Sequence, residues 1–393
     1  MSALPFFPDE EFEARLQNVR QTMAGRNLDV CLISAPENIY YLAGRDHFGF
    51  FAYHGLIVPR EGEMVLIARA MERVTVETQV NRAHFVGYAD GADPAQVTID
   101  MLRQMGLAGA RLGVEKNSLF LPVRIAEDLA AGLPNVEWTD ISGLVDELRQ
   151  TKSPREQVYV RQAAAVSDAM MTAAINTTRA GVNEWDIAAE VHRTMILAGG
   201  EPPGFGPFIR STRRLGEEHC TWTSHVLTAG EALFVELSGC VRRYHAPMGR
   251  LIFIGAAPPE THDIEQVCLE AFARVVKAIQ PGIKAREVYR AWQARVDEAG
   301  LAHYRRHHCG YLMGIGFPPS WVGGSEVVGL RPDSEVELRP GMTFHLMSWL
   351  MGSGRGDYFV SDAALLTEHG CEVLTTVPQH LHIVTQVATQ PDL

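Results

Sequence analysis

The chain has 393 residues, of which 46% are hydrophobic and 21% charged, and its formal net charge at pH 7 is −12. This length predicts two domains with ample material for a core. The negative charge and the absence of a Lys/Arg-rich stripe argue against nucleic-acid binding, and no apolar run approaches the roughly 18 residues of a membrane span. Because the N-terminus turns acidic where a signal peptide is apolar, and six cysteines are scattered without a CxxC pair, we expect a cytoplasmic protein with reduced thiols.

The first 150 residues predict a small α/β domain. Phe12, Leu16, Val19 and Met23 recur at helical spacing within residues 9–25. Short apolar runs then predict β-strands at 30–34, 55–59 and 64–68. Helical and strand patterns alternate up to about residue 140.

Residues 151–393 predict a second domain that mixes helices and strands. Ser153-Pro154 breaks the regular pattern before a long helix that starts at Glu156, and Asn183 with Asp186 forms an N-cap signal for the next helix. Two strands, 232–240 and 244–254, are expected to pair. Further helices are expected at about 260–280 and 284–299, before strand-rich segments punctuated by glycines.

Four segments in the second domain occur in a characteristic order: LFVELSGCVRRYHAPMGR, HHCGYLMGIGFPP, LRPGMTFHLMSWL and YFVSDAALLTEHGCEVLT. In this order and spacing they resemble the pita-bread hydrolases, which include methionine aminopeptidase, aminopeptidase P, prolidase and the metal-free creatinase. The resemblance covers nearly the whole chain. It implies a creatinase-type α/β N-terminal domain (1–150) followed by an α+β pita-bread catalytic domain (151–393).

In the family's peptidases these segments supply two aspartates, a histidine and two glutamates to a pair of metal ions. Such oxygen and imidazole ligands suit hard or borderline dications that share a nucleophilic water. The corresponding positions here are Glu236, Pro247, Tyr311, Met347 and Ser361. Only the first retains a carboxylate, so we expect a catalytic pocket without metal or cofactor.

The remaining residues resemble the metal-free branch of the family. His219 falls where creatinase carries its catalytic histidine. The segments RLGEEHCTWT, RRHHCGYLMGIGFPPSW and PGMTFHLMSWLMG look most similar to the ectoine hydrolases. This resemblance implies a metal-independent hydrolase that opens the cyclic amidine ring of ectoine to N-acetyl-2,4-diaminobutyrate. The amidinium group of ectoine is positively charged and is already an electrophile, so the reaction does not need a metal ion to polarise it.

Glu236 and His219 are the first catalytic candidates. Glu236 either attacks the amidinium carbon or holds the amidinium by charge-assisted hydrogen bonds while water attacks. The structural alternative is a buried carboxylate paired with Arg250 or Arg243. His219 is the candidate general acid/base, since imidazole titrates near neutral pH.

Further site candidates come from the same segments, and each has an ordinary structural alternative. Tyr311, at the former histidine-ligand position, can donate a hydrogen bond to substrate or be a core residue. Trp222 and Trp349 can stack on the flat amidinium or belong to the core. The other candidates for substrate contact are His308, His345 and, for the substrate carboxylate, Arg250 in competition with Arg210, Arg213 and Arg214.

Longer family members are usually homodimers in which the N-terminal domain of one subunit covers its neighbour's pocket. The resemblance therefore implies a homodimer, with residues 45–55 as the lid and Phe48 and Phe50 as substrate contacts. Dimer packing explains the same aromatic density.

Three rival functions remain open from the sequence. The first is a metal-free hydrolase of creatine or another amidine, and the second is a metallopeptidase whose ligands lie elsewhere. The third is a catalytically inactive pita-bread domain used for peptide binding. Retention of both a histidine and a carboxylate favours an enzyme, and the resemblance to the ectoine hydrolases implies a small-molecule substrate.

Overall fold

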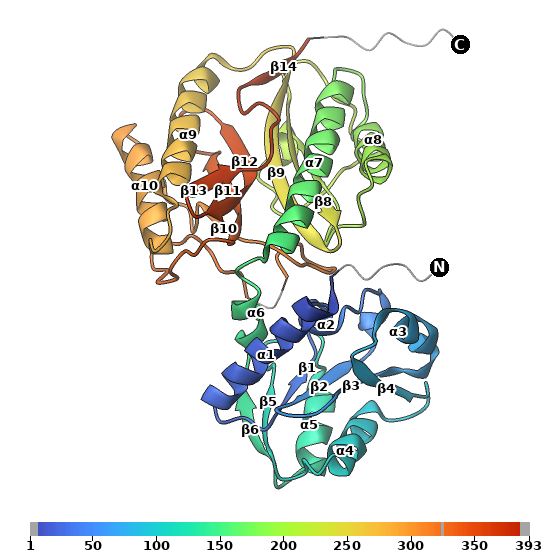
Figure 1. Cartoon of the computed structure of the whole chain (residues 1–393). Coiled ribbons are helices and arrows are strands. Elements are labelled where there is room, and N and C mark those ends of the chain that lie inside the picture. Colours follow the sequence, from blue (N-terminus) through green and yellow to red (C-terminus); the bar gives the residue numbers. More distant parts are fainter. Residues whose placement is uncertain (1–6, 324–325, 386–393) are drawn as a thin grey trace, which may run out of the picture. The chain divides into compact units, whose positions relative to one another are not determined.

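The computed structural model describes residues 7–323 and 326–385, which form two compact units (Figure 1). Unit 1 consists of the described residues up to Arg149, together with Gly323 and Glu326. Unit 2 consists of Gln150–Val322 and the described residues from Val327 onward. Each unit has its own β-sheet and its own hydrophobic core.

Unit 1 is built on a mixed six-stranded sheet with the strand order β4-β3-β2-β1-β5-β6. Strands β1 and β5 pair in parallel, as do β5 with β6 and β3 with β4, whereas β2 runs antiparallel to both of its neighbours. Its elements are α1 (Asp9–Gly25), β1 (Val30–Ile33), α2 (Pro36–Ala43), β2 (Gly55–Pro59), β3 (Met64–Arg69), α3 (Arg73–Gln79), β4 (Ala83–Tyr88), α4 (Pro94–Gln104), β5 (Arg111–Val114), α5 (Val123–Gly132), β6 (Glu137–Asp140) and α6 (Leu144–Leu148).

Unit 2 contains an eight-stranded sheet whose main path is β10-β11-β12-β9-β8-β7, with β13 beside β12 and β14 beside β9. Its elements are α7 (Pro154–Thr177), α8 (Glu184–Leu197), β7 (Phe208–Ser211), β8 (Ala232–Val241), β9 (Tyr244–Ile254), α9 (Pro259–Ala278), α10 (Ala285–Glu298), β10 (Gly310–Leu312), β11 (Thr343–Leu350), β12 (Tyr358–Thr367), β13 (Gly370–Val373) and β14 (His382–Val384).

The long helices of unit 2 begin where their caps predict. Ser153 accepts a hydrogen bond from the Glu156 amide while the Glu156 carboxylate accepts from Ser153, and Asn183 and Asp186 form the same reciprocal pair. The expected pairing of β8 with β9 is also present, from Ala232 opposite Phe253 to Val241 opposite Tyr244. Local sequence signals therefore define these elements.

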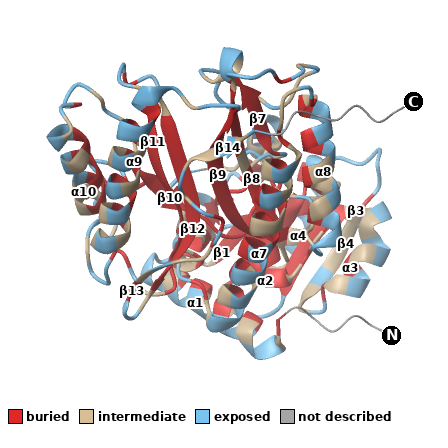
Figure 2. Ribbon diagram, turned by 90° about the horizontal axis from the view of Figure 1, so that it is seen from above, coloured by how far each residue is buried: buried red, intermediate tan, exposed pale blue. Residues whose placement is uncertain are grey.

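Helices cover the sheet of unit 2 on its outer side. Leu233, Val235 and Leu237 of β8 pack into one core with α7 and α8, whereas Leu346 and Leu350 of β11 pack into another with α9 and α10. The central strands are buried along their length (Figure 2). Since side chains alternate along a strand, the intervening residues of β8 and β11 point to the inner face, away from these helices.

The strand register aligns one row of residues on this inner face. Opposite one another lie Phe208 of β7, Glu236 of β8, Gly249 of β9, Ser361 of β12 and Met347 of β11. Residues two positions apart on a strand point to the same face. Pro247, two residues before Gly249, therefore lies on the inner face. His345, two residues before Met347, does so too, and Tyr311 lies opposite His345. All five positions that resemble metal-ligand positions thus lie on one face.

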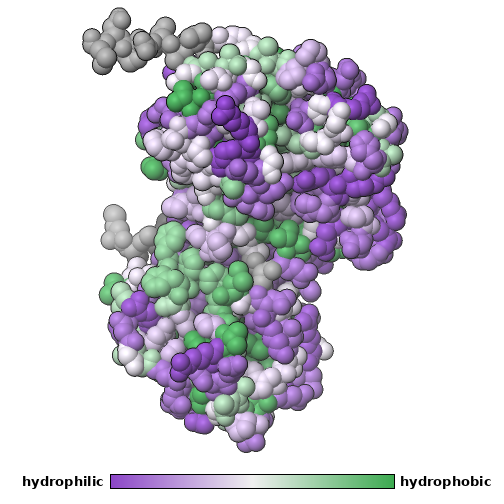
Figure 3. Space-filling view, turned by 180° about the vertical axis from the view of Figure 1, so that it is seen from behind, coloured by the Kyte–Doolittle hydropathy of each residue, from purple (hydrophilic) through white to green (hydrophobic). Residues whose placement is uncertain are grey.

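The exterior of unit 2 in Figure 3 is covered mainly by hydrophilic residues, with hydrophobic ones in small groups. Among the described residues, no helix is long and apolar enough to cross a membrane.

Candidate functional site

Glu236 lies on the inner face of unit 2, on β8 between β7 and β9. Its side chain is only 12% exposed, and the carboxylate accepts no hydrogen bond from any described residue. The Nε2 atom of His345 lies 3.7 Å from its Oε1. Burial raises the pKa of Glu236 to about 7, although the positive charges of Arg210 and Arg306 act in the opposite direction. Such an unsatisfied, perturbed carboxylate is typical of a functional site.

His345 connects two of the inner-face positions by hydrogen bonds. Its Nδ1 lies 2.8 Å from the Tyr311 hydroxyl and its Nε2 lies 2.8 Å from the Ser361 hydroxyl. Trp321 donates its indole N–H to the Tyr311 oxygen at 2.9 Å. Burial lowers the pKa of His345 to about 3, so the ring is neutral and one of its nitrogens donates while the other accepts. Tyr311, His345 and Ser361 therefore form one buried polar network beside Glu236.

Two groups of aromatic side chains include neighbours of Glu236 in the sheet: one contains Phe208, which lies opposite Glu236, and the other contains Phe234, two residues before it on β8. Phe205 and Phe208 pack against Trp321, with ring centroids 4.0 and 5.7 Å away, and Trp321 also lies 6.3 Å from the ring of His345. The second group consists of Phe234, Trp349 and Phe359, whose ring centroids lie 4.8 to 5.4 Å apart. Flat apolar walls of this kind suit a small planar ligand.

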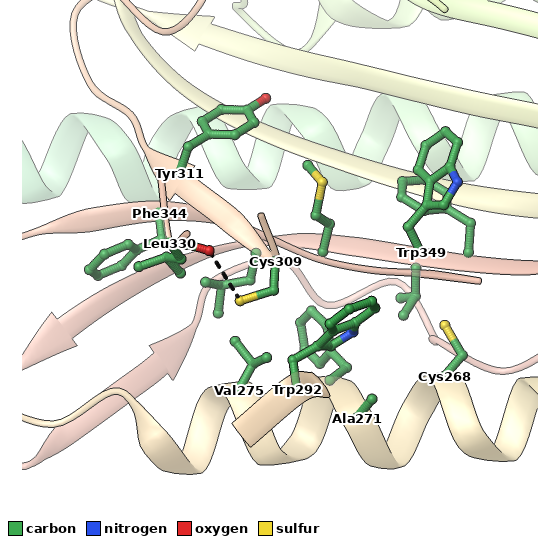
Figure 4. Close-up of a cluster of buried hydrophobic side chains, with 14 of the residues drawn as sticks. Cys268, Ala271, Val275, Trp292, Cys309, Tyr311, Leu330, Phe344 and Trp349 are labelled. Carbon is green, nitrogen blue, oxygen red and sulfur yellow. Dashed lines mark hydrogen bonds between the residues drawn. The ribbon is translucent and has the colours of Figure 1, made fainter. Parts of the chain in front are cut away.

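Tyr311 and Trp349 both point away from helix α9, as Figure 4 shows, whereas Trp292 and Val275 pack on the helix side. Trp349 is thus on the site face as its position predicts, but the guanidinium of Arg306 already lies 4.8 Å over its ring. His308 also lies at the site, with its ring 5.5 Å from that of Tyr311, and its buried Nδ1 has no hydrogen-bond partner in the described part of the chain. Burial lowers the pKa of His308 to about 3.

His219 lies in an exposed turn at the edge of the same face. The centroid of its ring lies 5.7 Å from that of Phe208, the β7 residue that lies opposite Glu236. Its φ of 53° is in the left-handed region, which histidine adopts more often than most residues. The buried carboxylate of Glu184 accepts hydrogen bonds from the amides of Ser211 and Thr223, which fixes both ends of the loop that carries His219.

The prediction that Arg250 binds substrate is wrong, because this side chain points to the other face of the sheet. Gly249, not Arg250, is opposite Glu236. The Arg250 guanidinium is fully buried and forms an ion pair with Asp362 at 2.8 Å. Its other N–H groups donate hydrogen bonds to backbone carbonyls, including those of Val377 and Pro378. It holds the C-terminal segment against the sheet and has no donor left for a ligand.

Of the two roles expected for Trp222, the structure shows the core residue and not the one that stacks on substrate. Its ring packs edge-on against His192 of α8 at 5.5 Å and joins the core that lies on the α7–α8 side of the sheet. Phe48 and Phe50 belong to unit 1, where Phe48 is 50% exposed and Phe50 packs against Phe120 at 5.5 Å. Their contact with substrate stays a prediction.

Arg210 is the residue that the sequence could not single out. It lies on β7 opposite Phe234, on the same face as Glu236, and its guanidinium stacks over the Phe234 ring at 4.3 Å. The side chain is 1% exposed, yet its Nε and Nη1 atoms have no hydrogen-bond partner among the described residues. A fully buried arginine with unsatisfied donors is unusual. The sequence alone offered four competing arginines and no sign of the short strand β7.

Comparison with known proteins identifies the family. Residues 158–368 match the model of metallopeptidase family M24, and residues 15–151 match the creatinase/prolidase N-terminal domain. The chain belongs to the M24 family. Membership confirms the predicted fold, an α/β creatinase-type N-terminal domain followed by a pita-bread domain.

This M24 chain is similar in sequence to an enzyme and similar in fold to several solved structures. The ectoine hydrolase of Halomonas elongata is 30% identical over 399 residues, which cover 97% of this chain and 99% of the relative. An Xaa-Pro dipeptidase from Bacillus anthracis superposes with a TM-score of 0.83 at 20% identity, covering 95% of this chain and all of the other. The N-terminal domain of the FACT subunit SPT16 from chickpea superposes with a TM-score of 0.76 at 13% identity, covering 94% and 97%. The two structures are similar in fold alone.

The donor set of this M24 chain does not fit the pair of metal ions that the family name implies. Of the five inner-face positions, only Glu236 offers a carboxylate; Pro247 has no ligating atom and Met347 a soft thioether. The hydroxyls of Tyr311 and Ser361 are hydrogen-bonded to His345. Within residues 7–323 and 326–385, no cluster of three or more His, Cys, Asp or Glu side chains is arranged to hold a metal.

Proposed function

We propose that this M24 protein is a metal-independent hydrolase that opens the ring of a zwitterionic cyclic amidine, ectoine, to N-acetyl-2,4-diaminobutyrate. The largely buried Glu236 carboxylate, which accepts no hydrogen bond from any described residue and lies on the same sheet face as Phe208 and Phe234, is the observation that carries this proposal. An amidinium is planar and positively charged, so it complements both features. The similarity to an ectoine hydrolase over nearly the full length supports the choice of ring.

The reaction adds water across the amidinium carbon and then breaks one of its two C–N bonds. Attack gives a tetrahedral carbon that bears oxygen and both nitrogens. Departure of one nitrogen, which takes up a proton, leaves an acetamide on the other. Charge balances, because the amidinium is replaced by one ammonium group.

In this scheme Glu236 provides the negative charge that binds the amidinium and directs attack at its carbon, either through its own oxygen or through a water molecule. His219 is the proposed general acid that protonates the departing nitrogen. The network of Tyr311, His345 and Ser361 holds the wall beside Glu236. An acid quench during turnover followed by intact-protein mass spectrometry distinguishes the two forms of attack, since only covalent attack leaves an adduct on Glu236.

A substrate panel tests the proposal. Purified protein is incubated separately with ectoine, creatine and an Xaa-Pro dipeptide, and products are followed by proton NMR. We expect ring opening of ectoine only. Cleavage of creatine would support the amidine-hydrolase rival, and cleavage of the dipeptide would support a peptidase. A protein that transforms none of these would fit the binding-module alternative.

The activity should depend on the ionisation of Glu236. Because burial raises the pKa of this carboxyl to about 7, it is largely protonated and neutral at pH 6 and ionised at pH 8. We expect the acid limb of the kcat/KM profile to have its midpoint near pH 7, since this constant reports ionisation in the free enzyme. A profile without an acid limb near pH 7 would argue against an ionised Glu236 as the binding form.

The Tyr311 hydroxyl should contribute more to stability than to turnover. In Tyr311→Phe, both the Trp321 N–H and His345 Nδ1 lose their buried partner. Leaving such groups unsatisfied costs about 1 to 3 kcal/mol, so we expect a clear fall in Tm with a smaller loss of kcat than a change at Glu236 causes. Thermal unfolding measured in a double-mutant cycle with Trp321→Phe isolates the hydrogen bond. Additive effects of the two changes would contradict the coupling.

The homodimer and the cytoplasmic location also stay predictions. Sedimentation velocity at several concentrations tests the first: a monomer at working concentration would remove the lid role predicted for Phe48 and Phe50.

A further inference from the structure

Arg210 is a charged group without a partner inside unit 2. Guanidinium keeps its proton at physiological pH even though burial lowers the pKa of Arg210. Its side chain makes no hydrogen bond to any described residue, and Nε and Nη1 are both shielded from solvent. Burying a charge without hydrogen bonds is costly. The arrangement is therefore expected in a protein whose ligand supplies the missing acceptors.

The negative charges near Arg210 do not satisfy it. Glu236 and Glu218 are its principal electrostatic partners, but neither forms an ion pair with it within 4 Å in the part of the chain that the structure describes. Glu236 lies on the adjacent strand β8, one diagonal step from Arg210 on the same face. A positive and a negative group thus lie near each other on one wall, and each lacks a hydrogen-bond partner.

Phe234 fixes where the guanidinium lies. The ring stands directly opposite Arg210 across the β7–β8 pair and covers one face of the guanidinium at 4.3 Å. With one face covered, the guanidinium directs its N–H donors into its own plane, which is the plane in which planar acceptors such as carboxylates bind.

We propose that Arg210 is the specificity-determining residue of this site, and that its guanidinium binds the carboxylate of a zwitterionic amidine whose amidinium contacts Glu236. This inference rests on the proposed function and adds a requirement to it. The site selects amidines that carry an acid group and rejects neutral or purely cationic ones, because without the acid group Arg210 remains buried and unpaired.

The test compares ectoine with the same methylated ring lacking its carboxyl group, on wild type and on Arg210→Met. For wild type we expect kcat/KM at least about a hundredfold higher for ectoine, which is the usual cost of truncating one side of a buried charge pair. In Arg210→Met this preference should nearly vanish, mainly through a higher KM for ectoine. Arg290→Met is the matched control, because Arg290 is exposed on α10 and pairs with Glu287, and it should behave as wild type.

Arg210→Lys extends the test should the Met variant unfold. Lysine keeps the charge but lacks the planar donors and the stacking surface, so it should recover only part of the preference. Wild type that hydrolyses both rings equally, or an Arg210→Met variant with an unchanged KM for ectoine, would overturn the inference while the proposed function stands.

A binding measurement separates this inference from the function itself. Piperidine-2-carboxylate has the ring and the acid group but no amidine. We expect it to raise the Tm of wild type and not that of Arg210→Met, even in a protein that hydrolyses no amidine. Equal Tm shifts in the two proteins would overturn the role of Arg210.

Discussion

Replacing Glu236 with Gln is expected to lower kcat for ring opening on the order of a thousandfold or more. The change removes the negative charge that the amidinium requires and keeps the size of the side chain. It should also stabilise the protein at pH 8. The folded state keeps a proton on Glu236 up to about pH 7, whereas the unfolded chain releases it near 4.5, so the native state binds more protons between these values. Wild-type stability therefore falls with rising pH through this window.

Turnover measurements test the predicted loss of kcat, and thermal unfolding of the same preparations tests the predicted gain in stability. At pH 8 the Gln variant should exceed wild type by on the order of 3 kcal/mol, and near pH 4 the difference should disappear. Glu298→Gln is the control, because Glu298 is exposed on α10 and pairs with Arg274. A Gln variant that is inactive and also less stable at pH 8 would indicate a structural carboxylate instead of a catalytic one.

His219→Ala should lower kcat by about a hundredfold to ten-thousandfold without changing Tm. General acid catalysis by a positioned histidine contributes rate factors of this size. The side chain is exposed in its turn, and hydrogen bonds from Glu184 hold the loop independently of it. His369→Ala, which removes another exposed histidine in the turn between β12 and β13, is the control. Wild-type kcat in His219→Ala would remove His219 from the mechanism, and a large fall in Tm would assign it to structure.

Much of the fold could be predicted from local signals. The capping residues Ser153 and Asn183 give the starts of α7 and α8, and the apolar runs either side of residue 242 give the β8–β9 hairpin. The inner-face position of Glu236 was likewise accessible, because it alternates with Val235 and Leu237 in an apolar strand.

The rest of the site depends on pairing between distant strands. Arg250 lies three residues after Pro247 in the same strand, and residues at odd spacing in a strand point to opposite faces. The prediction that placed Arg250 at the site is therefore inconsistent with its spacing from Pro247. That signal was present in the sequence. By contrast, Arg210 joins the site only because the four-residue strand β7 pairs with β8. The sequence predicts His345 at the site, but its hydrogen bonds to Tyr311 and Ser361 depend on the pairing of β11 with β10 and β12. No local pattern encodes these contacts.

Activity after metal removal tests the central claim most directly. Protein treated with a strong chelator and shown by elemental analysis to hold far less than one metal ion per chain is incubated with ectoine, and N-acetyl-2,4-diaminobutyrate is followed by proton NMR. The predicted result is ring opening at the rate of untreated protein, unchanged by added manganese, cobalt or zinc. A rate that falls on chelation and returns with one of these ions would contradict a metal-independent site built on Glu236.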